Sequence, residues 1–269
     1  MEAVSHRIQF RWHQLQHSGE FTDHWAIDDV VLQGPPPPLP DLPPFLIAAP
    51  SSSTSIAMLW VGVDRAVQYE VQRRQGFGPW SVAATVGSYI TYLIDTNVLP
   101  QGTYTYRVRA INGSGVSGWS PEATALTLST MQEWLGRNFG SLIMDDPAIL
   151  VSPSPDGTTP LLRYAFNLTI SEPAYSVTPG RSVSGFPMAW IDSKTRLLTV
   201  EYVRRKATSH PDIEYVVESS DSLHGWTASP VEGVVSPIDA LWERVRWQDQ
   251  IPADEKASRF VRVRVVYHE

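Results

Sequence analysis

The chain has 269 residues, of which 42% are hydrophobic and 18% are charged, a balance typical of folded proteins and a length typical of two domains. The net charge is −7 and the arginines alternate with apolar residues instead of clustering, which argues against nucleic acid as a partner. Cysteine is absent, which excludes disulfide frameworks and thiolate zinc sites. No long apolar stretch occurs, so neither a membrane span nor a signal peptide is predicted.

Residues 6–34 read "HRIQFRWHQLQHSGEFTDHWAIDDVVLQG", with the strand-like "WAIDDV" near the end. This segment resembles the last strands of jelly-roll domains of the MAM and reelin-repeat kind. Two strands are marginal alone, so residues 1–33 are predicted to be the C-terminal remnant of such a domain in a longer protein. The resemblance implies calcium in the intact jelly-roll domain, with Asp28 and Asp29 as ligands. Adjacent strand residues point to opposite faces, so a solvated strand end is the alternative.

A proline-rich segment follows at residues 34–44, with the sequence "GPPPPLPDLPP". Proline lacks a backbone N–H group and favours the extended polyproline II conformation. The segment is therefore predicted to be a linker that holds its flanks apart by roughly 30 Å, at about 3.1 Å per residue.

Residues 45–128 contain short segments of alternating polarity separated by turn residues, among them "SIAMLWVGV", "QYEVQRRQG", "WSVAATVG", "YTYRVRAIN" and "EATALTL". In "TYTYRVRAIN", Tyr104, Tyr106 and Val108 share one face of a strand. Arg107 and Arg109 share the other face, so one face is predicted to be buried and the other wet. This alternation predicts a β-sandwich.

The same residues resemble a fibronectin type III module. The resemblance rests on "AMLWVGV", "QYEVQRR" and "LPQGTYTYRVRAINGSGVSGWS". It implies that Trp60 is a core tryptophan of the second strand and that Leu99 and Tyr104 form a tyrosine corner. No Arg-Gly-Asp sequence stands in the loop after Asn112, so integrin-type adhesion is not implied.

Residues 129–269 form a second block, predicted to be a C-terminal β module. "MQEWLGRNFG" and "TPLLRYAFNL" have helical spacing, and "RLLTVEYVRRK", "IEYVVESSDS", "WERVRWQ" and "RFVRVRVVYH" have strand spacing. Two short helices leading into an antiparallel sheet are therefore expected. The block resembles a C-terminal module of large secreted bacterial proteins, in which an acidic loop of calcium type precedes a "LLEYALG"-like helix. Here that loop reads "SPSPDGTTP" and retains only Asp156, which argues against calcium.

No motif in the sequence indicates catalysis. "GSGVSG" matches a dinucleotide-binding pattern, but no helix follows it, so its glycines are predicted to form a turn between strands. The sequence contains no G-x-S-x-G, H-E-x-x-H or phosphate-binding P-loop pattern. The chain is therefore predicted not to be an enzyme, with no catalytic residues and no cofactor in residues 34–269.

Ten tryptophans are many for a chain of this size. Trp25, Trp60 and Trp134 lie in apolar patterns and are predicted to be core residues. Five others, among them Trp226, lie near turns or among polar neighbours, where an indole could stack on a sugar or pack at a domain end. The remaining four are the candidate ligand-binding residues Trp80, Trp119, Trp242 and Trp247.

Together these observations predict an all-β, multidomain, extracellular protein that is secreted or attached to the surface of a bacterial cell. Its expected role is spacing and binding, either adhesion or carbohydrate binding, with a polysaccharide or a cell-surface protein as partner. The alternative is that the chain is the accessory C-terminal region of a secreted hydrolase whose catalytic domain lies upstream.

Overall fold

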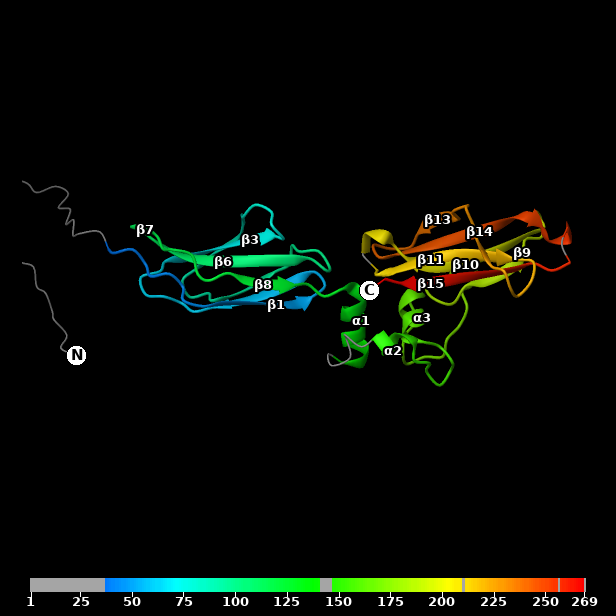
Figure 1. Cartoon of the computed structure of the whole chain (residues 1–269), viewed down its shortest axis with the longest axis horizontal. Helices are drawn as coiled ribbons and strands as arrows, with labels where there is room; N and C mark the ends of the chain where they lie inside the picture. Colours follow the sequence, from blue (N-terminus) through cyan, green and yellow to red (C-terminus); the bar gives the residue numbers. More distant parts are fainter. Residues whose placement is uncertain (1–36, 141–146, 210, 256, 269) are drawn as a thin grey trace, which may run out of the picture. The chain divides into compact units, whose positions relative to one another are not determined.

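The computed structural model describes residues 37–140, 147–209, 211–255 and 257–268 (Figure 1). The chain divides into two compact units, Met1–Pro37 and Pro38–Glu269. The predicted jelly-roll remnant at residues 1–33, which includes Asp28 and Asp29, lies outside the described residues.

Residues 45–128, here called the sandwich, fold into two antiparallel sheets. One sheet has the strand order β1-β2-β5, and the other has the order β4-β3-β6-β7 with β8 also paired to β6. The strands are β1 Leu46–Ser52, β2 Ser55–Trp60, β3 Gln68–Gln75, β4 Ser81–Gly87, β5 Tyr92–Asp95, β6 Thr103–Asn112, β7 Gly115–Val116 and β8 Ala123–Leu126. All five predicted strands are present, and β1, β5 and β7 are additional.

The core of the sandwich confirms the predicted alternation along β6. Tyr104, Tyr106, Val108 and Ala110 are all buried, while the arginines between them lie on the opposite face. Trp60 is 2% exposed and meets Tyr69 edge to face, with the two ring centres 5.7 Å apart. Trp60 therefore lies in the core of the sandwich.

The tyrosine corner is present. The backbone N–H of Leu99 donates to the hydroxyl oxygen of Tyr104 at 2.9 Å. Leu99 therefore takes part through its backbone, since its side chain is 54% exposed. The neighbouring Val98 is 5% exposed and supplies an apolar side chain to the core.

Replacing Tyr104 with phenylalanine is expected to cost about 1 kcal/mol of unfolding free energy, since the Leu99 N–H then loses its partner. Tyr89→Phe is the matched control, because Tyr89 is 88% exposed. A denaturant titration of both variants measures the difference. Equal and negligible losses would contradict the tyrosine corner.

The second half of the proline-rich segment contacts the sandwich. The side-chain amide of Asn112 donates to the carbonyl oxygen of Pro38 at 2.9 Å, and Arg65 pairs with Asp41 at 3.0 Å. Pro40 and Pro43 are buried. Residues 38–43 therefore do not stand clear of the sandwich as the spacer prediction expected.

Residues 129–269, here called the C-terminal module, combine three short helices with two antiparallel sheets in the described part of the chain. The sheet orders are β13-β14-β10-β9 and β12-β11-β15. The elements are α1 Thr130–Phe139, α2 Pro147–Val151, α3 Pro160–Ala165, β9 Met188–Ile191, β10 Leu197–Arg205, β11 Ile213–Ser220, β12 Thr227–Ala228, β13 Val234–Pro237, β14 Trp242–Pro252 and β15 Phe260–Tyr267. The two predicted helices and four predicted strands are all found. The all-β class is confirmed, with one helix more than expected.

Local sequence signals explain where the helices begin. Ser129 and Gln132 form a capping box before α1, each side chain accepting from the other's backbone N–H group. Thr159 caps α3, and Pro160 occupies its first turn, where no N–H donor is needed.

Apolar residues of the helices share one core with both sheets, namely Met131, Leu135, Leu150, Tyr164, Phe166, Tyr202, Ile213 and Val245. Within the described residues no helix has the length and apolar character to cross a membrane.

Candidate functional site

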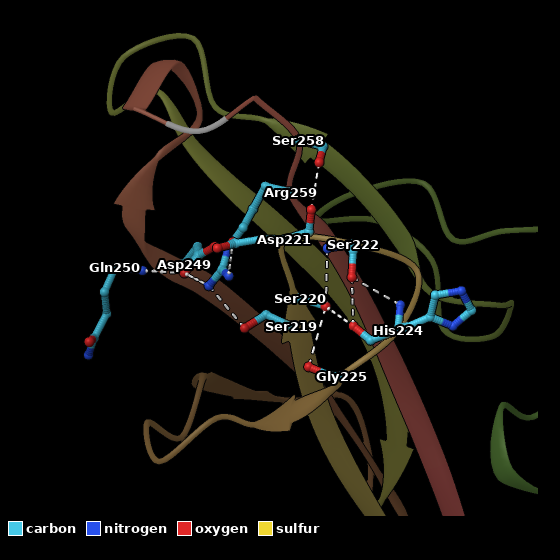
Figure 2. A network of polar contacts seen from close by, with 10 residues as sticks. All are labelled: Ser219, Ser220, Asp221, Ser222, His224, Gly225, Asp249, Gln250, Ser258 and Arg259. Carbon is cyan, nitrogen blue, oxygen red and sulfur yellow. Dashed lines mark hydrogen bonds and ion pairs between the residues drawn. The ribbon is translucent and has the colours of Figure 1, made fainter.

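The C-terminal module carries an open cavity of about 480 Å³ beside the end of β11. Figure 2 shows the polar side chains around it, which come from β11, from the loop that follows, from β14 and from the residues just before β15. Serine and threonine hydroxyls, two carboxylates and one guanidinium dominate the lining. The lining residues are Ser219, Ser220, Asp221, Ser222, His224, Gly225, Thr227, Ala228, Ser229, Pro230, Trp247, Asp249, Gln250, Ile251 and Arg259.

Residues 219–226, here called the serine loop, are held in shape by their own hydroxyl groups. The buried Ser220 hydroxyl donates to the carbonyl oxygen of His224 at 2.6 Å and accepts from the Ser222 N–H at 3.2 Å. The Ser222 hydroxyl donates to the same carbonyl at 2.9 Å. The loop therefore presents a fixed, hydroxyl-rich rim (Figure 2).

Arg259 pairs with both carboxylates of the cavity lining. Its guanidinium donates to Asp249 at 2.9 Å, to Asp221 at 2.8 Å and to the Ser219 hydroxyl at 3.0 Å. Asp249 is only 4% exposed. Burial raises its pKa, but hydrogen bonds from Arg259 and from the Gln250 N–H outweigh burial and hold the pKa below its ordinary value. The hydrogen bond with Asp249 raises the pKa of Arg259, so both groups stay charged and paired.

Trp242 and Trp247 do not offer the exposed faces that their sequence positions suggested. Trp247 is 2% exposed, and its indole N–H donates to the Ser229 hydroxyl at 2.8 Å. Trp242 is 5% exposed, and its cross-strand partner Arg205 places a guanidinium 4.4 Å from the ring centre. The expectation that they are exposed is wrong, but for different reasons. Trp247 lies on the inward face of β14 with Val245 and Asp249. Trp242 lies on the other face of the strand, where Val177, Val203 and the guanidinium of Arg205 cover it.

Trp80 and Trp119 are half-buried and stack with arginines on the β3–β6 face of the sandwich. Arg107 lies 4.1 Å from the ring centre of Trp80 and 4.2 Å from that of Trp119. Arg74 adds a second contact to Trp80 at 4.7 Å, and Arg109 adds one to Trp119 at 4.5 Å. Cation–π stacking therefore already occupies ring faces that a sugar would need. A ligand role for these two tryptophans remains a prediction.

Of the cavity residues, sequence reasoning named only Trp247, although one signal for the others was present. Along β14, Val245, Trp247 and Asp249 occupy successive inward positions, so a carboxylate stands where the pattern demands an apolar side chain. A charged residue at such a position indicates a buried polar network. Its partner, Arg259, lies ten residues further on and could not be identified from spacing alone.

Comparison with known proteins gives one family match and several structural matches. A family model described as Reelin subrepeat B matches residues 1–33. Among solved structures, an Fn3-like protein from Clostridium thermocellum is 28% identical, with a TM-score of 0.31, over 34% of this chain and 95% of that chain. The FN5 domain of Drosophila Lar is 22% identical, with a TM-score of 0.30, over 34% of this chain and 98% of that one. Comparison with curated proteins gives no match.

The sandwich has a fibronectin type III-like fold, because it consists of two antiparallel sheets and contains a tyrosine corner. The C-terminal module is a second antiparallel β unit. Across the described residues there is no cluster of three or more histidine and acidic side chains that could hold a metal ion.

Proposed function

We propose that the chain is the non-catalytic tail of an extracellular, multidomain bacterial protein, in which the sandwich serves as a spacer and the C-terminal module binds a neutral glycan. The observation that carries this proposal is the cavity at the serine loop. Its rim is rich in hydroxyl groups, while the charges on its floor are paired with one another. Such a surface suits a ligand with many hydroxyl groups and no charge.

The state of the buried carboxylates supports a binding role over a catalytic one. Asp249 is ionised and clamped by Arg259, so it is a poor proton donor. Glu201, which is 1% exposed, accepts from the Gly180 N–H at 2.5 Å and from Arg246 at 2.7 Å. Both carboxylates are held in ion pairs, so neither is free to act as a general acid.

Any glycan binding at this open cavity is expected to be weak, with a dissociation constant near 1 mM, or about −4 kcal/mol. Several copies on one polymer or one cell surface would raise the overall avidity. The test is retardation of the full chain in native gels that contain soluble polysaccharides from a broad panel. At least one neutral polysaccharide is expected to retard it.

Two substitutions at the rim test the location of the site. His224 and Thr227 are both exposed on the cavity lining, so His224→Ala and Thr227→Ala are expected to reduce retardation without lowering the melting temperature. His268→Ala is the matched control, since His268 is also exposed but lies outside the lining. Retardation that survives both rim substitutions would place the site elsewhere. No retardation by any glycan would leave only the spacing role and would favour the accessory tail of a hydrolase.

A further inference from the structure

The segment between α2 and α3 has the length and the glycine position of a helix–loop–helix calcium site. Such loops follow the pattern D-x-[DN]-x-[DN]-G-x5-E over about 12 residues. Counting from Ser152, the fifth position is Asp156, the sixth is Gly157 and the twelfth is Arg163. Gly157 has a φ of 79°, consistent with the sharp turn for which these loops require glycine.

The side chains at this loop do not fit calcium. Calcium takes roughly six to eight oxygen ligands, including a bidentate carboxylate at the twelfth position. Ser152 and Ser154 stand where the first two carboxylates belong, and Arg163 stands in place of the glutamate. A fixed positive charge at that position repels a metal ion. Loop geometry and ligand chemistry therefore disagree at residues 152, 154 and 163, and residue 163 adds a positive charge.

The guanidinium of Arg163 instead binds oxygens around the loop. Its side chain is 4% exposed. One terminal nitrogen donates to the carbonyl oxygens of Thr169 and Glu172, the latter at 3.0 Å, and the other donates to the Asp156 carboxylate. The other oxygen of Asp156 accepts from the Thr158 N–H at 3.1 Å and from its hydroxyl at 2.7 Å. A buried cation thus joins the loop, α3 and the segment that follows.

We propose that the guanidinium of Arg163 replaces the calcium ion of this loop, as a cation supplied by the chain itself. The charges of the loop are consistent with this replacement. The Arg163 guanidinium faces one carboxylate, that of Asp156, and the neutral Ser152 and Ser154 add no negative charge. An acidic loop would need a divalent ion to offset its repulsion. The helix–loop–helix unit therefore stays folded at any calcium concentration. This inference does not depend on glycan binding.

The test compares calcium dependence in the full chain and three variants. The melting temperature of the unmodified chain is expected to be the same in millimolar calcium and in chelator. Arg163→Met is expected to lower it by about 5–10 °C, without rescue by calcium, because buried oxygens lose their cation. The combined change Ser152→Asp, Ser154→Asp and Arg163→Glu is expected to create a site with a dissociation constant of about 0.1–1 mM. Calcium then raises the melting temperature of that variant.

The decisive control keeps Arg163 and changes only Ser152→Asp and Ser154→Asp. It is expected to bind calcium at least tenfold more weakly than the triple variant, because the guanidinium still holds the centre of the loop. Arg262→Met controls for loss of an arginine, since Arg262 is 45% exposed. Equal calcium binding by the double and triple variants would overturn the proposal. So would a triple variant that neither binds calcium nor folds with it, or an unmodified chain that calcium stabilises.

Discussion

Replacing Asp249 with alanine is expected to lower the unfolding free energy of the C-terminal module by about 3–4 kcal/mol. The substitution removes a carboxylate that is 4% exposed. It leaves Arg259, whose side chain is only 14% exposed, with the half-exposed Asp221 as its carboxylate partner. Removing one partner of a buried ion pair typically costs roughly 3–5 kcal/mol, because the other charge remains buried without compensation. Calorimetry of the full chain measures the loss as a downward shift of one transition.

Asp221→Ala is the control for this prediction. Asp221 binds the same guanidinium at 2.8 Å, but its side chain is 52% exposed, so its loss is expected to cost less than about 1 kcal/mol. Similar losses for the two variants would show that Asp249 does not anchor the network.

The pH dependence of stability gives a second view of the same pair. The pKa of Asp249 is lowered in the folded state, so its ionised form contributes stability above the ordinary value of 3.8. That contribution is lost as the pH falls below 3.8 and through the folded-state pKa. The difference in stability between the unmodified chain and Asp249→Asn should therefore be constant near neutral pH and shrink in acid. A difference that grows in acid would contradict this sign.

Replacing Arg107 with alanine is expected to cost about 2–3 kcal/mol of sandwich stability. Arg107 stacks on both Trp80 and Trp119, and it donates to the side-chain oxygen of Gln72 at 2.8 Å. Each cation–π contact contributes roughly 0.5–1 kcal/mol, and the hydrogen bonds contribute about 1 kcal/mol more. A denaturant titration followed by tryptophan fluorescence measures the loss.

Arg65→Ala is the control, since Arg65 forms an exposed pair with Asp41. The Arg107→Ala change should also make Trp80 and Trp119 more accessible to acrylamide quenching, because it uncovers both rings. Unchanged quenching together with a loss no larger than that of Arg65→Ala would show that the stacking contributes little.

The sequence predicted the long strands well because their polarity alternates over many residues. The ten-residue β6 is the clearest case, with its tyrosines buried and its arginines on the other face. Strands such as β7 and β12 have only two residues each, too few to show a period. Tertiary pairing creates these strands, and no local pattern marks them.

Tryptophan exposure was predicted less well, because the groups that cover an indole come from other strands. Arg205 on β10 covers Trp242 on β14, and Arg107 on β6 covers Trp80, which precedes β4. A polar neighbour in sequence suggested an exposed ring, whereas the neighbour in space is a guanidinium. The cavity was missed for the same reason, since Asp221, Asp249 and Arg259 meet only in the folded module.

The indole N–H resonances of the tryptophans test the proposed glycan site most directly. The Trp247 indole N–H is bonded to Ser229 on the cavity lining, whereas Trp60 lies in the sandwich core. In a chain labelled with 15N at tryptophan, titration with a soluble oligosaccharide from a polysaccharide that retards the chain should shift the Trp247 signal and leave the Trp60, Trp80 and Trp119 signals in place. Shifts at Trp80 and Trp119 with an unmoved Trp247 would contradict binding at the cavity and would place the glycan on the sandwich instead.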